Sequence, residues 1–81
     1  MTLKVLFFSI LRPIVGGEEI EVEVADSANV GTLLTTLYET YPDLKDWDGK
    51  IRVAVDLEYV DRDHPLAPGQ EIAIMPPVQG G

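Results

Sequence analysis

The stretch EIEVEVADSANVGTLLTTLYETY, residues 19–41, determines the fold because the spacing of its apolar residues changes halfway along. Over residues 19–24 apolar and acidic side chains alternate strictly, which predicts a strand with one buried face and three glutamates turned toward water. The apolar residues that follow recur at the spacing of one helix face, namely Val30, Leu33, Leu34, Leu37, Tyr38 and Tyr41. A strand followed by such a helix predicts that the helix packs across a sheet.

Both ends of this predicted helix carry recognisable signals. Asn29, or alternatively Ser27, can cap its first turn, and Pro42 ends it. Because glycine and threonine are weak helix formers and both occur in the segment, its stability must come from packing on the sheet. Beyond the helix we expect residues 43–50 to form a polar connection, anchored by the ring of Trp47.

Four further stretches predict the rest of the sheet. The opening run, Leu3–Leu11, is nearly all apolar and rich in β-favouring residues, which predicts a central strand covered on both faces. Gly16 and Gly17 favour a turn, so we expect this strand to form a hairpin with residues 19–24. The remaining strands are predicted at Ile51–Val55, Glu58–Val60 and Glu71–Met75.

The order of these elements predicts an α+β fold, with one main helix packed on a mixed sheet. Because the first and last strands have the most apolar sequence, we expect them to lie side by side, parallel, in the centre of the sheet. This arrangement is the ubiquitin-like β-grasp. We expect it to occupy residues 1–77, with residues 78–81 as a flexible tail that ends in Gly-Gly.

The charge balance and composition exclude several functional classes. Fourteen acidic and six basic residues give a net charge of −8, which disfavours binding to nucleic acid or to an anionic membrane. A basic protein partner would complement this charge, although the acidity could equally serve solubility alone. The absence of cysteine excludes disulfides, thiolate metal sites and cysteine nucleophiles. No apolar run approaches the ~20 residues of a membrane span and no leader opens the chain, so we expect a cytoplasmic protein.

The side chains provide no catalytic constellation. His64, the only histidine, lies in a turn between Asp63 and Pro65, where bonding to its neighbours is the simplest interpretation. Ser9 is expected within a strand and Ser27 next to a helix start, with no base nearby in the sequence. We therefore expect no metal site and no enzymatic activity of the chain on its own.

The end of the chain is the feature that points to chemistry. Pro76 and Pro77 end the last strand and project the chain, and Gly80 and Gly81 have no side chains to obstruct a narrow channel. The reactive group at this tip is the α-carboxylate of Gly81. As an acyl-adenylate this carboxylate becomes electrophilic and can accept sulfur or an amine.

In these features the sequence resembles the small, sulfur-carrying subunits of molybdopterin synthase. The resemblance covers essentially the full chain and is densest at Lys4–Phe8, Arg12, Asp63–Leu66, Gly69–Ala73 and Pro76–Gly81. It implies that an ATP-dependent adenylating enzyme of the ubiquitin-activating type and a sulfur donor convert the Gly81 carboxylate to a thiocarboxylate. The tail would then enter the large subunit, which holds the catalytic side chains, and pass sulfur to cyclic pyranopterin monophosphate. ATP would be used by the activating enzyme and no cofactor bound by this chain, in an expected heterotetramer.

The resemblance also implies which residues contact the partner. These are Phe8, Arg12, Tyr59 and Met75 on the domain, followed by Pro77, Val78, Gln79 and Gly80 in the tail. Strand alternation agrees for two of them: if Phe7 and Ile74 face the helix, Phe8 and Met75 lie on the opposite face of the sheet. A minor second core under the loops is the alternative interpretation of these apolar residues.

Besides the molybdopterin carrier, the sequence leaves a second and a third function open. Carriers for cysteine, thiamine or tRNA thiolation and ubiquitin-like protein modifiers use the same Gly-Gly tail, and Arg12-Pro13 followed by Gly16-Gly17 also resembles the cysteine-biosynthesis carriers. A structural β-grasp adaptor is the third alternative. The Pro-Pro-Val-x-Gly-Gly ending resembles the molybdopterin branch most.

Overall fold

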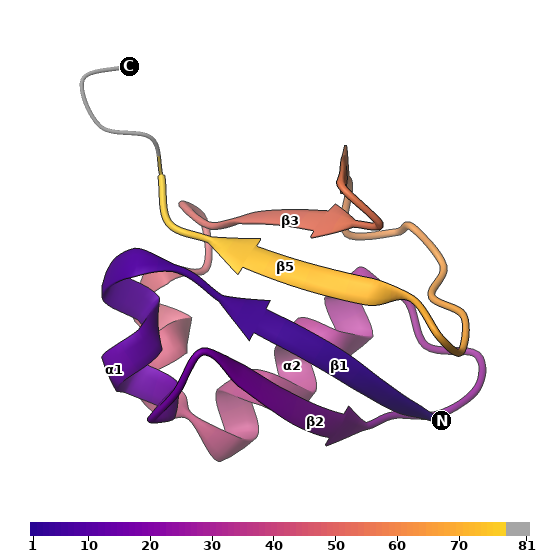
Figure 1. Cartoon of the computed structure of the whole chain (residues 1–81), viewed down its shortest axis with the longest axis horizontal. Helices are drawn as coiled ribbons and strands as arrows, with labels where there is room; N and C mark the ends of the chain where they lie inside the picture. The colour runs from indigo at the N-terminus through magenta and orange to yellow at the C-terminus, as the bar shows by residue number, and fades with distance from the viewer. Residues whose placement is uncertain (78–81) are drawn as a thin grey trace.

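A mixed sheet of five strands carries one long helix across one of its faces (Figure 1). The structure is a computed structural model that describes residues 1–77. In chain order the elements are β1 (Thr2–Phe7), the 3-10 helix η1 (Ser9–Leu11), α1 (Arg12–Val15), β2 (Glu19–Glu23), α2 (Val30–Thr40), the 3-10 helix η2 (Pro42–Trp47), β3 (Arg52–Val55), β4 (Glu58–Val60) and β5 (Glu71–Met75). None of the helices within residues 1–77 combines the length and apolar character that crossing a membrane requires.

The strand order is β2-β1-β5-β3-β4, so the first and last strands occupy the centre as the sequence predicts. β1 and β5 pair in parallel, with Leu6 opposite Ala73, and every other pair in the sheet is antiparallel. Figure 1 shows α2 crossing behind the sheet and leaving the other face toward the viewer. This is the β-grasp fold, and the prediction of fold class is confirmed.

The core lies between α2 and the sheet face that it covers. Most of the largest fully buried side chains come from the two central strands and from the helix stripe, and the other two come from η1 and η2: Leu3, Val5, Phe7, Ile72, Ile74, Val30, Leu33, Leu34 and Leu37, with Leu11 and Leu44. Asn29 caps the helix, since its side-chain oxygen accepts a hydrogen bond of 2.9 Å from the backbone N–H of Thr32. Burial of each leucine or isoleucine contributes about 1.5–3 kcal/mol, which offsets the weak helix propensity of this segment.

The opening strand is shorter than its apolar sequence predicts. β1 ends at Phe7, and residues 9–15 form η1 and α1 instead of continuing to Leu11 as a strand. Pro13 lies in the first turn of α1, where its missing N–H costs nothing, and would have broken a strand ladder. Gly16, at φ +80°, ends this helix in the left-handed region, so it is a helix C-cap and not a tight hairpin turn.

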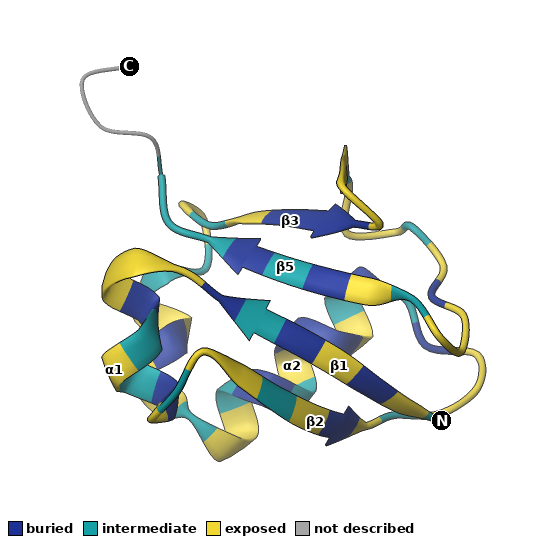
Figure 2. Cartoon of the chain, viewed as in Figure 1, coloured by how far each residue is buried: buried dark blue, intermediate teal, exposed yellow. Residues whose placement is uncertain are grey.

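Two other expectations need correction. β1 and β2 do pair as an antiparallel hairpin, but β1 is covered on one face only, since Lys4 is exposed and Leu6 half-buried (Figure 2). Residues 43–50 are not a plain connection, because η2 spans Pro42–Trp47 and buries Leu44 in the core. Trp47 packs against that core, as the sequence predicts.

Candidate functional site

The candidate site lies where β5 leaves the sheet. β5 ends at Met75, and the half-buried residues Pro76 and Pro77 carry the chain away from the end of this central strand (Figure 1). Proline has no N–H to offer a neighbouring strand, so the ladder stops here. The predicted tail residues Val78, Gln79, Gly80 and Gly81 lie outside the described residues.

The predicted partner residues Phe8 and Met75 lie on the sheet face that α2 does not cover, which we call the open face. Phe7 and Ile74 are each 1% exposed in the core, whereas Phe8 is 37% exposed and Met75 half-buried. Phe8 keeps an extended backbone after β1, so its side chain points opposite to that of Phe7. The alternation predicted for these four residues is confirmed.

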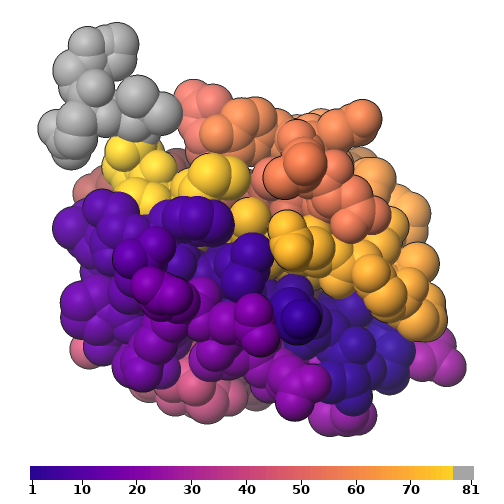
Figure 3. Space-filling model, viewed as in Figure 1, coloured from indigo at the N-terminus to yellow at the C-terminus, as the bar shows by residue number. Residues whose placement is uncertain are grey.

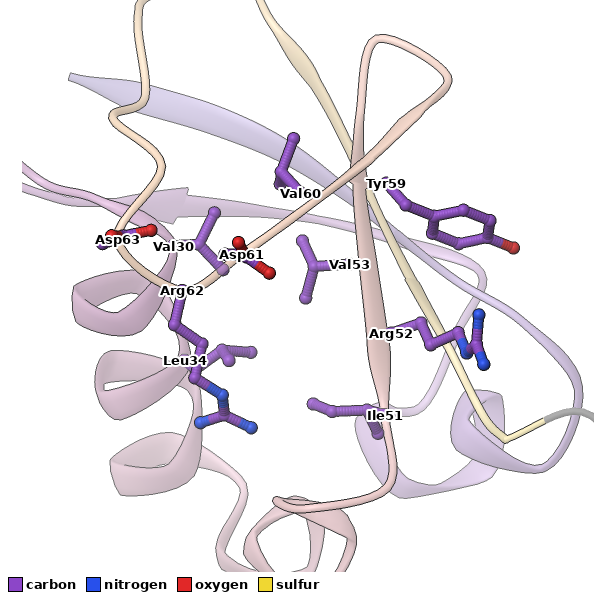
Figure 4. A pocket seen from close by; sticks show the side chains of 10 residues that line it. All are labelled: Val30, Leu34, Ile51, Arg52, Val53, Tyr59, Val60, Asp61, Arg62 and Asp63. Carbon is purple, nitrogen blue, oxygen red and sulfur yellow. The ribbon is translucent and has the colours of Figure 1, made fainter.

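Tyr59, from the edge strand β4, completes the apolar part of the site. Its side chain is 62% exposed, and its hydroxyl donates to the sulfur of Met75 over 3.8 Å. Figure 4 shows Tyr59 pointing away from Val53 and Val60, which face the helix side of the sheet. Phe8, Tyr59 and Met75 therefore form the exposed apolar part of the open face, and we call these three residues the apolar patch.

Two arginines stack on the aromatic rings of the patch. The guanidinium carbon of Arg12 lies 5.9 Å from the centroid of the Phe8 ring, and its Nε donates to the carbonyl of Phe7 over 3.2 Å. The guanidinium carbon of Arg52 lies 5.7 Å from the centroid of the Tyr59 ring. Such contacts fix the orientation of both partners.

Arg52 is a residue that the sequence analysis missed. It pairs in register with Met75 across β3 and β5, which puts it on the open face beside the start of the tail. The only local signal was alternation, because Val53 and Val55 face the core and Arg52 must then face away. Its proximity to Tyr59 depends on how β3, β4 and β5 pair, which local spacing does not specify.

An open groove of about 720 Å³ runs along β3 and β4 beside α2, and Arg52 and Tyr59 are among the residues that line it (Figure 4). Near it, Asp48 accepts hydrogen bonds of 2.7 Å from the hydroxyl of Tyr38 and from the guanidinium of Arg62. Burial, with the bond to Asp48, raises the pKa of Tyr38 to about 12. The bond from Tyr38 in turn lowers the pKa of Asp48. All three side chains are satisfied within the fold, so this cluster connects α2 to two loops.

The hydrogen bonds that hold His64 in its turn are made by its backbone. Its backbone N–H donates to the carbonyl of Asp61 over 3.1 Å, and its carbonyl accepts from the N–H of Val30 over 3.0 Å at the start of α2. Within residues 1–77 no three side chains of the metal-binding kind come together. Beside the start of the tail, the described residues offer aromatic side chains stacked with arginines.

The sequence is similar to a family model and to several known proteins over most of its length. The model of the ThiS family matches residues 5–81. The molybdopterin synthase sulfur carrier subunit of Escherichia coli K12 is 37% identical over 98% of this chain and 99% of its own. That of Chlamydomonas reinhardtii is 34% identical over the whole of both chains.

Solved structures give the same fold. The small archaeal modifier protein 1 of Haloferax volcanii matches with a TM-score of 0.85 at 28% identity, over 95% of this chain and 98% of its own. A chain in the complex of subunits 1 and 2 of the molybdopterin-converting factor from Helicobacter pylori matches with a TM-score of 0.72 at 27% identity, over 100% of both chains.

Proposed function

The chain belongs to the ThiS family, and from this premise we propose that it is the sulfur carrier subunit of molybdopterin synthase. The observation that carries the proposal is the similarity to sulfur carrier subunits over 98% of this chain and 99% of the Escherichia coli relative. In this proposal the catalytic side chains lie on a large subunit. The structure from Helicobacter pylori is a complex of subunits 1 and 2 of the molybdopterin-converting factor, and it supports a second, different subunit as the partner.

The proposed carrier group is the carboxylate of Gly81. An adenylating enzyme joins this carboxylate to the α-phosphate of ATP and releases pyrophosphate. A sulfur donor then displaces AMP, which leaves a thiocarboxylate on Gly81. In the large subunit the thiocarboxylate sulfur bonds to a carbon of cyclic pyranopterin monophosphate and displaces an oxygen from it. Water then cleaves the bond between this sulfur and the carbonyl carbon of Gly81, which regenerates the carboxylate. Two carriers supply the two sulfurs of the dithiolene, which suits a heterotetramer, and the use of ATP suits a cytoplasmic location.

The apolar patch and the tail act together in this proposal. Phe8, Tyr59 and Met75 dock on the partner, and Pro76 and Pro77 give the tail a stiff start beside them. The four residues beyond Pro77 span at most about 14 Å when fully extended. The active site that receives Gly81 must therefore lie within that distance of Pro77 in the docked chain.

Mass spectrometry tests the carrier step. The full chain is incubated with ATP, the adenylating enzyme and a sulfur source, and its last residues are then analysed. We expect a mass gain equal to the difference between a sulfur and an oxygen atom, located on Gly81. No gain on Gly81 in the presence of an active adenylating enzyme would contradict the proposal.

The second candidate is a protein modifier or a carrier for cysteine, thiamine or tRNA thiolation. The likeness to the small archaeal modifier protein 1, with a TM-score of 0.85, favours the modifier among these. A modifier would join Gly81 to a lysine amine through an isopeptide bond. Mass analysis of a tryptic digest distinguishes the two, because an isopeptide appears as the peptide of residues 63–81 joined to a lysine of another protein.

A further inference from the structure

Arg52 stands out among the cations of this acidic chain. Within the described part of the chain, three of the six basic residues find a carboxylate: Lys4 pairs with Glu19, Arg12 with Glu18 and Arg62 with Asp48. Of the other three, Lys45 lies on η2 and Lys50 lies 5.9 Å from the centroid of the Trp47 ring, whereas Arg52 lies beside the apolar patch. Arg52 has no carboxylate within 4.0 Å among residues 1–77, and it stacks on the ring of Tyr59 instead. Its charge is exposed and available to a partner.

On the open face, glutamates extend along the whole of β2, whereas Arg52 lies on β3 on the other side of the central strands. Lys4 lies in register between Glu21 of β2 and Glu71 of β5, and Glu19 of β2 lies opposite Leu6. Beside Pro76, Arg12 stacks on Phe8 and pairs with Glu18, while Arg52 stacks on Tyr59. The space-filling view shows this face with β1 and β5 at the surface and no helix over them (Figure 3).

We infer that Arg52 determines the specificity of docking and that the molybdopterin synthase large subunit presents a carboxylate opposite it, beside the entrance for the tail. This inference rests on the proposed function. Docking on the apolar patch removes water from the guanidinium, which is costly unless a carboxylate replaces the water. Because Tyr59 already holds Arg52 in place, little side-chain entropy is lost when the pair forms.

The glutamates of β2 and Glu71 of β5 set a direction for docking. A partner docked in the reverse orientation would bring its carboxylate against Glu21 and Glu71, where like charges repel. Only one orientation pairs Arg52 and leaves the tail next to its channel. The charge pattern thus sets the direction of docking, and the apolar patch provides the contact area.

The test measures binding of the full chain to the purified large subunit by titration calorimetry. Arg52→Glu is compared with Lys45→Glu, which makes the same change of charge on η2, an element that packs against α2. We expect Arg52→Glu to raise Kd at least about tenfold and Lys45→Glu to change it less than about twofold. Arg52→Ala should weaken binding less than Arg52→Glu and flatten the dependence of Kd on salt.

Thermal unfolding of each variant controls for folding. Because Arg52 is exposed, we expect its substitutions to leave the midpoint of thermal unfolding nearly unchanged. Equal Kd values for Arg52→Glu and Lys45→Glu would overturn the inference and leave the proposed function intact. No binding of the unmodified chain to the large subunit would overturn the proposed function, and the inference with it.

Discussion

At the scale of single residues, the exposed aromatic side chains of the open face carry the clearest functional expectation. Tyr59 is 62% exposed, so its side chain contributes little to the stability of the isolated fold. Aromatic residues that become buried in an interface contribute most of its binding free energy. The same side chain should therefore matter far more for association than for stability.

We predict that Tyr59→Ala weakens binding to the large subunit by about 2 kcal/mol, roughly a 30-fold rise in Kd. Leu57→Ala is the matched control, because Leu57 is 90% exposed and lies in the β3–β4 turn, away from the end of β5. Titration calorimetry gives the Kd of each variant and calorimetric melting its stability. A loss of thermal stability with unchanged Kd in Tyr59→Ala would support the second-core interpretation instead.

Tyr38 carries a pH dependence of stability. Its hydroxyl donates to Asp48, and its pKa rises from the ordinary value of 10.0 to about 12 in the folded state. A raised pKa means that the contribution to stability is fully present below about pH 10 and is lost as the pH rises through about 12.

We therefore predict that the melting temperature of the chain falls as the pH rises from about 10 to 12. The melting temperature of Tyr38→Phe should fall less steeply over that interval. Tyr59→Phe, which removes an exposed phenol, is the control and should follow the unmodified chain. Melting curves recorded by circular dichroism along this pH series check the prediction. Identical slopes for Tyr38→Phe and the unmodified chain would show that the bond to Asp48 does not couple to folding.

At the scale of elements, the sequence predicts those whose periodicity is regular. β2, α2 and β5 lie where alternation or helical spacing puts them, and β1 begins where expected. The error at residues 8–11 arose because an apolar run does not distinguish a strand from short helices. Pro13, which suits the first turn of a helix, follows two residues after the predicted end of the strand.

The start of α2 offers a direct test of an element boundary. Asn29 accepts from Thr32, whereas Ser27, the other cap candidate, is exposed two residues earlier. We predict that Asn29→Ala lowers the free energy of unfolding by about 1 kcal/mol and that Ser27→Ala leaves it nearly unchanged. Chemical denaturation of both variants measures this. A larger loss from Ser27→Ala would mean that the helix begins earlier.

At the scale of the whole molecule, the site combines residues that are far apart in the sequence. The exposure of Phe8 and Met75 could be predicted because each strand alternates on its own. The stack of Arg52 on Tyr59 and the sign change of charge across the open face could not, since both depend on cross-strand register. Local spacing identifies the members of the site, and only the folded sheet shows their arrangement.

In the proposed function, the fold places the surface that docks on the large subunit beside the strand that leads to the tail. β5 pairs with β1 on one side and β3 on the other, so the strand that leads to the tail is held in the centre of the sheet. A partner that binds the apolar patch therefore receives the tail from a fixed point. Extension of the chain by one residue past Gly81 moves the reactive carbonyl by ~3.5 Å, as far as the separation that reacting atoms need.

The central claim is that Gly81 delivers the sulfur, and a single-turnover reaction tests it most directly. Thiocarboxylated chain is mixed with the large subunit and cyclic pyranopterin monophosphate, and the sulfurated pterin is quantified by liquid chromatography and mass spectrometry. We predict product in proportion to the thiocarboxylate supplied, and none from the unmodified chain or from a chain extended past Gly81, although both bind the large subunit. Equal sulfuration by the extended chain, without trimming of the added residue, would contradict the account.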